Sequence, residues 1–191
     1  FGFKCFLLHS GVEEFPPLAA AELEEYLREL RSFGALMIVH AEDSHAIDRG
    51  AQPHGESYAD FLLSRPRGAE NLAIAQVIEQ ARWTGCRVHI LHLSSSDALP
   101  MITTARRDGV QLTVETCPHY LTFTAEEIPD GATQFKCCPP IREADNRERL
   151  WKGLGDPVAV EGEADAAAVG LEIVRTGDGR RRSGARGEGH G

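Results

Sequence analysis

The sequence predicts an α/β fold in which helices cover a parallel β-sheet, and three observations support this. Four short apolar runs are typical of strands buried on both faces, at residues 1–8, 35–43, 87–95 and 111–121. Segments with apolar residues at helical spacing lie between these runs. Strand and helix alternate along the chain, as they do where crossover helices join parallel strands.

Proline, glycine and serine residues mark where each expected helix begins or ends. The first is expected between Pro17 and Gly34, since proline suits the first turn of a helix and glycine ends one. The second is expected over residues 69–84 and closed by Gly85. The third follows the Ser-Ser-Ser-Asp run at 94–97, a helix-start signal, and is closed by Gly109. The apolar residues of these helices are Leu23, Tyr26, Leu27 and Leu30, then Ile74, Val77, Ile78 and Ala81, then Leu99 and Ile102.

Two segments depart from this alternation. Residues 43–67 are polar and rich in glycine and proline, so we expect a long loop, with one helical turn at 58–63 and a functional role. The fourth strand, residues 111–121, should be stopped by Pro118. Periodicity alone leaves open whether the sheet is doubly wound or part of a closed barrel.

Composition narrows the class of protein. The 191 residues are 42% hydrophobic and 26% charged, which favours one globular domain. A net charge of −9 argues against binding to nucleic acid or to an anionic membrane, and favours a small substrate. Neither a membrane span nor a signal peptide is indicated, so the cytoplasm is the expected location. The cysteines are odd in number and lack paired spacing, so we expect reduced thiols at Cys5, Cys86, Cys117, Cys137 and Cys138.

The two ends of the chain suggest that it is incomplete. The first residue is Phe1, within an apolar run, so the chain is expected to begin inside a fold. We expect a domain over residues 1–154. Residues 155–191 are biased to glycine, alanine and arginine, which predicts a disordered tail or a segment read out of frame.

Ionisable side chains gather where the predicted strands end. In parallel α/β folds the carboxyl ends of strands meet at one face, which selects Lys4, His40, His89, His92 and His119. A single histidine at a strand end is more often packed than functional, and a lysine there could be merely exposed. A lysine and two histidines that converge from three strands favour metal-assisted hydrolysis instead. The lysine must lose its proton, which burial favours, to act as a base or to form a carbamate.

Several ordered motifs resemble the allantoinases, members of the amidohydrolase superfamily. They are GFKCFLLHSGVEEFPP at 2–17, VHAED around His40, YADFLLSRPRGAENLAI at 58–74, HILHLSS around His92, ETCPHYL at 115–121 and KCCPPIR at 136–142. Together they cover about residues 1–152. The resemblance to allantoinases in particular rests on the first motif and the last.

The resemblance implies a partial (β/α)₈ TIM barrel, made of about the fourth to the seventh strands. It implies two divalent metal ions, expected to be zinc, and a CO₂-derived carbamate on Lys4 that bridges them, with His40 and His92 on the second metal ion. Cys138 matches a position whose backbone approaches the substrate, and its thiol should be packed. His89 and His119 are expected to be structural or to support the ligands.

The implied reaction is metal-dependent hydrolysis of a cyclic amide, allantoin to allantoate, in a parent enzyme that is a homotetramer. The His-x-His pair of the family's first strand and the aspartate of its last, the general base, are missing from this chain. We therefore expect the chain alone to be inactive and to bind metal poorly. Three alternatives remain: a hydantoinase, dihydropyrimidinase or dihydroorotase, a non-catalytic scaffold protein, and a gene fragment with no role of its own.

Overall fold

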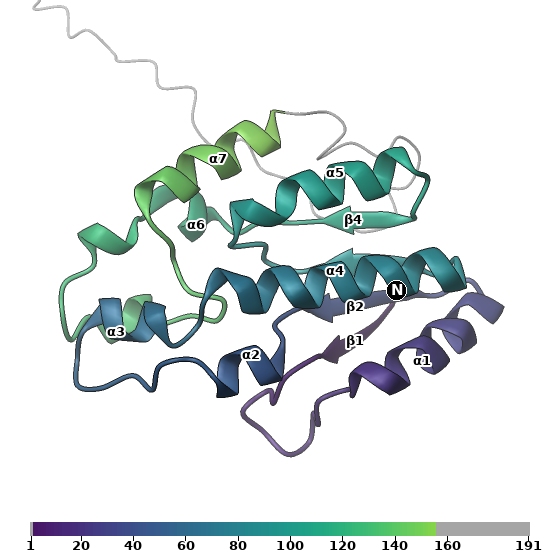
Figure 1. Ribbon diagram of the computed structural model, residues 1–191, viewed down its shortest axis with the longest axis horizontal. Helices are drawn as coiled ribbons and strands as arrows, with labels where there is room; N and C mark the ends of the chain where they lie inside the picture. The colour runs from purple at the N-terminus through teal and green to yellow at the C-terminus, as the bar shows by residue number, and fades with distance from the viewer. Residues whose placement is uncertain (1, 156–191) are drawn as a thin grey trace, which may run out of the picture.

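The computed structural model describes residues 2–155, and their centre is a four-stranded parallel sheet (Figure 1). The strands are β1 (Gly2–Phe6), β2 (Leu36–His40), β3 (Arg87–Ile90) and β4 (Leu112–Val114). Each strand pairs in parallel with the next one along the chain, so the order in the sheet is β1-β2-β3-β4. The predicted α/β class and parallel sheet are confirmed.

Three helices connect the strands and lie side by side along the sheet (Figure 1). They are α1 (Ala20–Ser32), α4 (Arg67–Thr84) and α5 (Leu99–Arg107). Gly34, Gly85 and Gly109 follow them with positive φ angles of 73°, 66° and 83°, a conformation that glycine adopts at little cost. The three helix ends that the sequence predicted at glycine residues are therefore confirmed.

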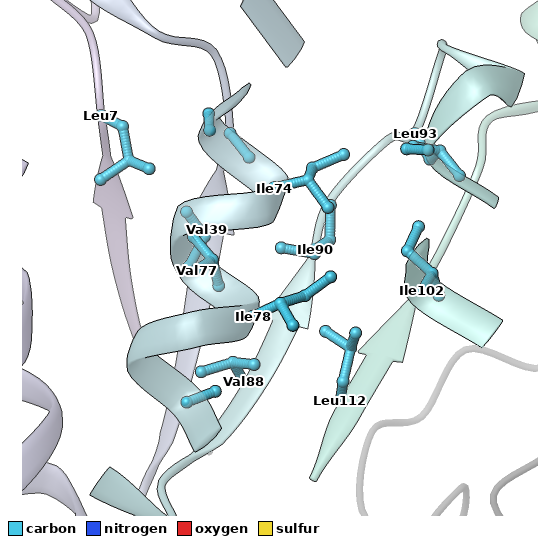
Figure 2. Close-up of a cluster of buried hydrophobic side chains, with 14 of the residues drawn as sticks. Leu7, Val39, Ile74, Val77, Ile78, Val88, Ile90, Leu93, Ile102 and Leu112 are labelled. Atoms are coloured by element: carbon cyan, nitrogen blue, oxygen red, sulfur yellow. The ribbon is translucent and has the colours of Figure 1, made fainter. Parts of the chain in front are cut away.

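The hydrophobic core lies between the sheet and α4 (Figure 2). Ile74 and Val77 of the helix are fully buried, and Val39, Val88 and Ile90 of the central strands are buried with them. Burial of such a side chain contributes about 1.5 to 3 kcal/mol each. This packing fixes which face of the sheet the helices cover.

The remaining elements refine two sequence predictions. Within the expected loop, the turn at 58–63 is the helix α3 (Tyr58–Leu63), and a second short helix, α2 (Ser44–Asp48), begins where the Asp43 carboxylate accepts a hydrogen bond from the Ala46 N–H. The fourth strand was predicted too long. It ends at Val114, and the residues from Pro118 form the helix α6 (Pro118–Thr122), because proline suits the first turn of a helix.

After α6 the described chain closes with short turns and one longer helix. These are η2 (Ala125–Glu127), η3 (Thr133–Phe135) and α7 (Ala144–Leu154), while η1 (Ser96–Ala98) precedes α5. The tail predicted for residues 155–191 lies, apart from Gly155, outside the described residues. Over the part that is described, no helix combines the length and apolar character needed to cross a bilayer.

Within residues 2–155 the sheet has two edges, β1 and β4. The exposed face of β1 includes Phe3, whose side chain is 56% exposed. An apolar edge strand offers unpaired backbone groups to other chains. Within the described residues, β1 therefore combines an open edge with an exposed aromatic side chain.

The helix stop at Gly85 gives a stability prediction. Gly85→Ala should lower the free energy of unfolding by about 1 kcal/mol, because alanine disfavours a left-handed conformation. The control is Gly68→Ala inside α4, where an added methyl group meets open space, and it should leave stability unchanged or raise it by up to about 1 kcal/mol. Urea unfolding of the 191-residue chain measures both. Equal effects of the two substitutions would contradict this account of the helix end.

Candidate active site

The core places the ionisable strand residues on the opposite face of the sheet. Side chains alternate between faces along a strand, so His40 and His89 point away from the helices because Val39 and Val88 point towards them. Lys4 lies in the same row of the sheet as His89, two strands away. Three of the predicted site residues therefore share one face.

His92 reaches the same place by a different route. It follows β3 and has a φ of 41°, a left-handed conformation that is unusual for a residue other than glycine. Its ring lies against that of His40, with centroids 4.6 Å apart and an interplanar angle of 69°. The two histidines that the sequence predicted to converge are thus in contact.

The protonation state of His92 follows from its surroundings. Burial, together with the neighbouring His40 and Lys4, lowers its pKa to about 4, so the ring is neutral at pH 7. Its Nδ1 is buried and has no hydrogen-bond partner among the described residues. A neutral imidazole nitrogen without a partner has a free lone pair or a free N–H group.

His40 is held by a buried carboxylate. Its Nε2 lies 2.8 Å from Oε2 of Glu42, which also accepts a hydrogen bond from Nη1 of Arg65 at 2.7 Å. Burial raises the pKa of Glu42, but the bond from His40 and the charge of Arg65 outweigh it, so the net pKa is lowered. The ionised carboxylate can only accept, so Nε2 of His40 carries the proton in this contact.

A second buried carboxylate holds the turn after His92. Glu70, near the start of α4, accepts hydrogen bonds from the backbone N–H groups of Ser94 at 2.7 Å and Ser95 at 2.8 Å. Arg142 lies beside it, with Nη2 3.5 Å from Oε2. Burial raises the pKa of Glu70 to about 7, although Arg142 and the two N–H groups act in the opposite direction.

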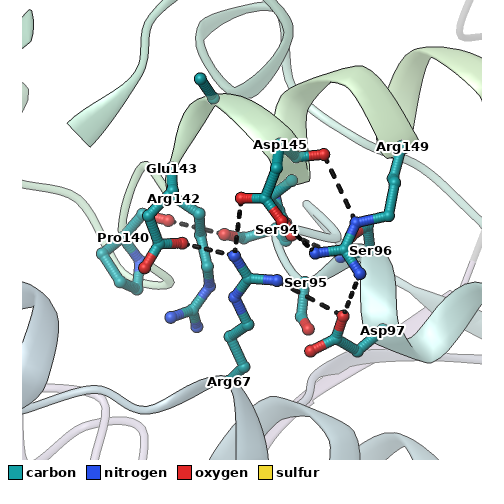
Figure 3. A network of polar contacts seen from close by, with 12 residues as sticks. Arg67, Ser94, Ser95, Ser96, Asp97, Pro140, Arg142, Glu143, Asp145 and Arg149 are labelled. Atoms are coloured by element: carbon teal, nitrogen blue, oxygen red, sulfur yellow. Dashed lines mark hydrogen bonds and ion pairs between the residues drawn. The ribbon is translucent and has the colours of Figure 1, made fainter. Parts of the chain in front are cut away.

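Ion pairs surround this turn on its solvent side (Figure 3). Arg67 at the start of α4 pairs with Asp97 at 3.3 Å and with Glu143. Arg149 of α7 pairs with the same Asp97 at 3.0 Å and with Asp145 at 2.6 Å. These pairs are partly exposed, and such pairs contribute about 0 to 1 kcal/mol each. The buried bonds of Glu70 are therefore the stronger restraint on the turn.

Lys4 is less enclosed than its expected chemistry requires. Because β1 is an edge of the described sheet, the Lys4 side chain is exposed, and its Nζ lies 4.7 Å from the centre of the Phe6 ring. The described residues do not supply the burial that would help the amine to lose its proton. Lys4 shares the face of His40 and His92, but not their enclosure.

The other candidates have structural surroundings. Nδ1 of His89 lies 2.8 Å from the Thr113 hydroxyl, and its Nε2 is 3.4 Å from the Glu115 carboxylate, an ion-pair distance. His119 on α6 packs against the Tyr120 ring, with centroids 4.1 Å apart.

Cys138 lies at an exposed position of its turn, next to the buried Pro139 and Pro140. Its thiol was expected to be packed, and burial raises the pKa of that thiol although the residue as a whole is exposed. This turn nevertheless lies beside the His92 loop, since the Ser94 hydroxyl donates to the Pro140 carbonyl at 2.6 Å. The turn that contains Cys138 is therefore next to the loop that follows His92.

Sequence reasoning missed the buried charged residues of the site. Glu42 stands two residues after His40, and Glu70 precedes Ile74 and Val77 by four and seven residues, so it lies on the apolar stripe of its helix. An acidic residue in register with buried apolar positions is a usable signal, because a buried charge must be paired. Arg142 has no comparable pattern around it.

The residues present fit part of a metal site. Two adjacent imidazoles, one neutral with a buried Nδ1 that has no partner, suit a divalent ion such as zinc. Among residues 2–155, no three histidine, cysteine, aspartate or glutamate side chains gather closely enough to hold a metal ion. Any further ligand must be Lys4 or must come from outside the described residues.

The sequence of the chain is similar to those of known proteins. No protein-family model matches the chain. The chain is 59% identical over 156 residues to the allantoinase of Streptomyces avermitilis, a match that covers 82% of this chain and 35% of that protein. It is 48% identical over 185 residues to the allantoinase of Saccharomyces cerevisiae, with 93% of this chain and 40% of that protein covered.

Solved structures agree on the fold. L-hydantoinase from Arthrobacter aurescens matches with a TM-score of 0.75 and 29% identity, over 82% of this chain and 36% of that chain. Dihydropyrimidinase from Brevibacillus agri matches with a TM-score of 0.73 and 28% identity, over 81% of this chain and 34% of that chain. The four strands are thus an arc of a hydantoinase-like TIM barrel, which resolves the choice that periodicity left open.

The match covers part of each curated relative. The chain spans between 35% and 40% of the length of the two curated relatives. Its motifs, its strand order and its neighbours in structure all agree within that span. The chain is therefore an allantoinase homologue of the amidohydrolase fold.

Proposed function

We propose that this chain supplies one half of the metal centre of an allantoinase, an enzyme that hydrolyses a cyclic amide bond of allantoin to give allantoate. The observation that carries the proposal is the contact between His40 and His92, in which a buried ring nitrogen of His92 has no partner. High identity to two allantoinases supports the choice of substrate.

In this proposal Lys4, His40 and His92 hold the metal ions. A divalent metal ion supplies Lewis acidity, which polarises a carbonyl oxygen and makes water a nucleophile at neutral pH. His92 contributes a neutral ring, because burial keeps its pKa far below 7. His40 donates Nε2–H to Glu42, so its Nδ1 is the nitrogen that carries the lone pair for a metal.

Lys4 contributes as a carbamate. Its deprotonated amine would form an N–C bond with the carbon of CO₂ as one C=O π bond opens, and would release a proton. The resulting carbamate would have two oxygens that share one negative charge and could serve as ligands for cations. Since Lys4 is exposed among the described residues, this step requires further residues to cover β1. The ligands of the first metal ion and the general base, which returns a proton to the leaving nitrogen, are assigned to the part of the relatives' length that this chain does not span.

A hydantoinase-type enzyme would differ from an allantoinase in its preferred substrate, and a scaffold protein would differ in not needing the metal ligands. Hydantoinases and dihydropyrimidinases match at lower identity, 29% and 28%, than the Streptomyces allantoinase at 59%, which favours allantoin. A non-catalytic scaffold protein would not depend on the histidine pair. Both alternatives predict results that differ from ours in the chimera described next.

The first test is a chimera in which the matching region of the Streptomyces avermitilis allantoinase is replaced by that of this chain. It should hydrolyse allantoin in preference to hydantoin and dihydroorotate. His40→Ala and His92→Ala should each reduce activity by more than about 100-fold, because loss of a ligand should exceed the loss of a residue that only supports one. His54→Ala, at an exposed histidine of the loop before α3, is the control and should retain activity.

The role of Lys4 has its own variant in the same chimera. Lys4→Arg keeps the positive charge but cannot form a carbamate, because arginine does not lose its proton in proteins. We expect it to be as inactive as Lys4→Ala. An active Lys4→Arg chimera, or full activity in the two histidine variants, would contradict the assignment of these ligands.

A second prediction concerns the 191-residue chain by itself. It should show no allantoin hydrolysis above a Lys4→Ala control and should bind zinc weakly in calorimetric titration, because the described residues offer only part of a ligand set. Hydrolysis by the purified chain that Lys4→Ala abolishes would show that this part of the sequence is sufficient for catalysis.

A further inference from the structure

Glu70 is a buried carboxyl group whose hydrogen bonds leave its own helix. The residue is 2% exposed, and it shares the buried face of α4 with Ile74 and Val77. A buried carboxyl group is costly unless it is bonded. Both of its oxygens accept backbone N–H groups of the turn after β3, at Ser94 and Ser95. The carboxyl group therefore acts on that turn.

The turn depends on side chains from elsewhere for its shape. Besides Glu70, Asn146 of α7 binds it twice, accepting from the Ser96 N–H and donating to the Ser94 carbonyl, both at 2.8 Å. The Ser94 hydroxyl donates to the Pro140 carbonyl. Glu70 of α4 and Asn146 of α7 thus make four hydrogen bonds to the backbone of residues 94–96. The turn itself follows the last residue of β3, so no strand pairing of β3 holds it.

His92 needs such a restraint because its backbone is strained. Leu91 on one side donates to the Val39 carbonyl at 3.1 Å, and Leu93 on the other donates to the Glu115 carbonyl at 2.7 Å. Between these two bonds His92 has the positive φ that turns its ring to His40. The turn beyond Leu93 adds a further restraint on the same segment. If that turn were released, Leu93 could shift, His92 could relax to an ordinary φ, and its ring would move away from His40.

Hydrogen bonds and an ion pair connect the residues that hold the His92 turn to those that hold His40. Nη1 of Arg142 donates to the Arg65 carbonyl at 2.9 Å, while its Nη2 lies 3.5 Å from Glu70. Arg65 in turn bonds Glu42, the partner of His40. Arg142, Glu70 and Glu42 are no more than 3% exposed. One connected set of buried polar groups thus runs from the His92 turn to His40.

We propose that Glu70 is a positioning residue: by binding the backbone of Ser94 and Ser95 it holds the His92 ring against His40. The metal-binding purpose of that contact rests on the proposed function, but the contact itself does not.

The direct test observes the two rings in the 191-residue chain. With labelled histidine, the ring protons of His40 and His92 should give a nuclear Overhauser effect, since the ring centroids are 4.6 Å apart. Glu70→Gln exchanges one acceptor oxygen for an amide that opposes a backbone N–H, and Glu70→Asp keeps the carboxyl group but is one methylene too short to reach both donors. Each should lose the cross-peak.

The matched control is Ile74→Ala, one turn further along the same helix and just as buried. It removes apolar packing and leaves the hydrogen-bonding groups of Glu70 and Asn146 in place, so the cross-peak should persist even though the chain is less stable. Retention of the cross-peak in Glu70→Gln or Glu70→Asp, its loss in Ile74→Ala, or its absence from the unsubstituted chain would each overturn the inference.

Zinc affinity and kinetics of the chimera give a second test, which also applies to variants whose 191-residue chain is too unstable for NMR spectroscopy. Glu70→Asp should weaken zinc affinity and lower kcat by about 10- to 100-fold, as is typical when a residue that orients a ligand is changed. KM for allantoin should change by less than about threefold, because the substrate contacts remain. Unchanged zinc affinity would overturn the inference while leaving the proposed function intact. An unsubstituted chimera without activity would instead refute the proposed function, and the ring contact would still decide the role of Glu70.

Discussion

Burial of one face of the sheet against α4 is the constraint on which the rest of the structure depends. Val39, Val88 and Ile90 are held in the core, and because side chains alternate, their neighbours must point to the other face. A slip of a single residue in β2 would carry His40 into the core and leave Val39 at the site. Packing of apolar side chains therefore determines where the ionisable side chains lie.

A second level of order comes from buried polar groups. Strand position alone does not orient His92, which lies beyond the end of β3 with a positive φ. Its direction depends on the turn that Glu70 and Asn146 bind, while His40 depends on Glu42 and Arg65. Removing one partner from such a buried set leaves another charge unpaired, which typically costs about 3 to 5 kcal/mol. The two rings are thus fixed by hydrogen bonds of their neighbours as well as by their own packing against each other and, for His40, against Phe6.

The fold was largely predictable because it is built from regular patterns. Apolar runs, helical spacing and three glycine stops predicted the sheet and its three main helices, and the strand-end rule predicted the convergence of His40 and His92. The end of the fourth strand was not predicted, since Pro118 can stop a strand or begin a helix. The support from Glu70 and Arg142 was not predicted either, because it joins residues far apart in sequence. Neither the exposure of Lys4 nor that of Cys138 follows from a local pattern.

The central claim is that His40 and His92 face one metal ion. Anomalous X-ray scattering at the zinc edge, from crystals of the chimera, tests it most directly. The account predicts a zinc peak within bonding distance of a ring nitrogen of each histidine, with Nε2 of His40 still bonded to Glu42. Zinc bound elsewhere while both rings remain without a metal ion, or bound through Nε2 of His40 with Glu42 displaced, would contradict it.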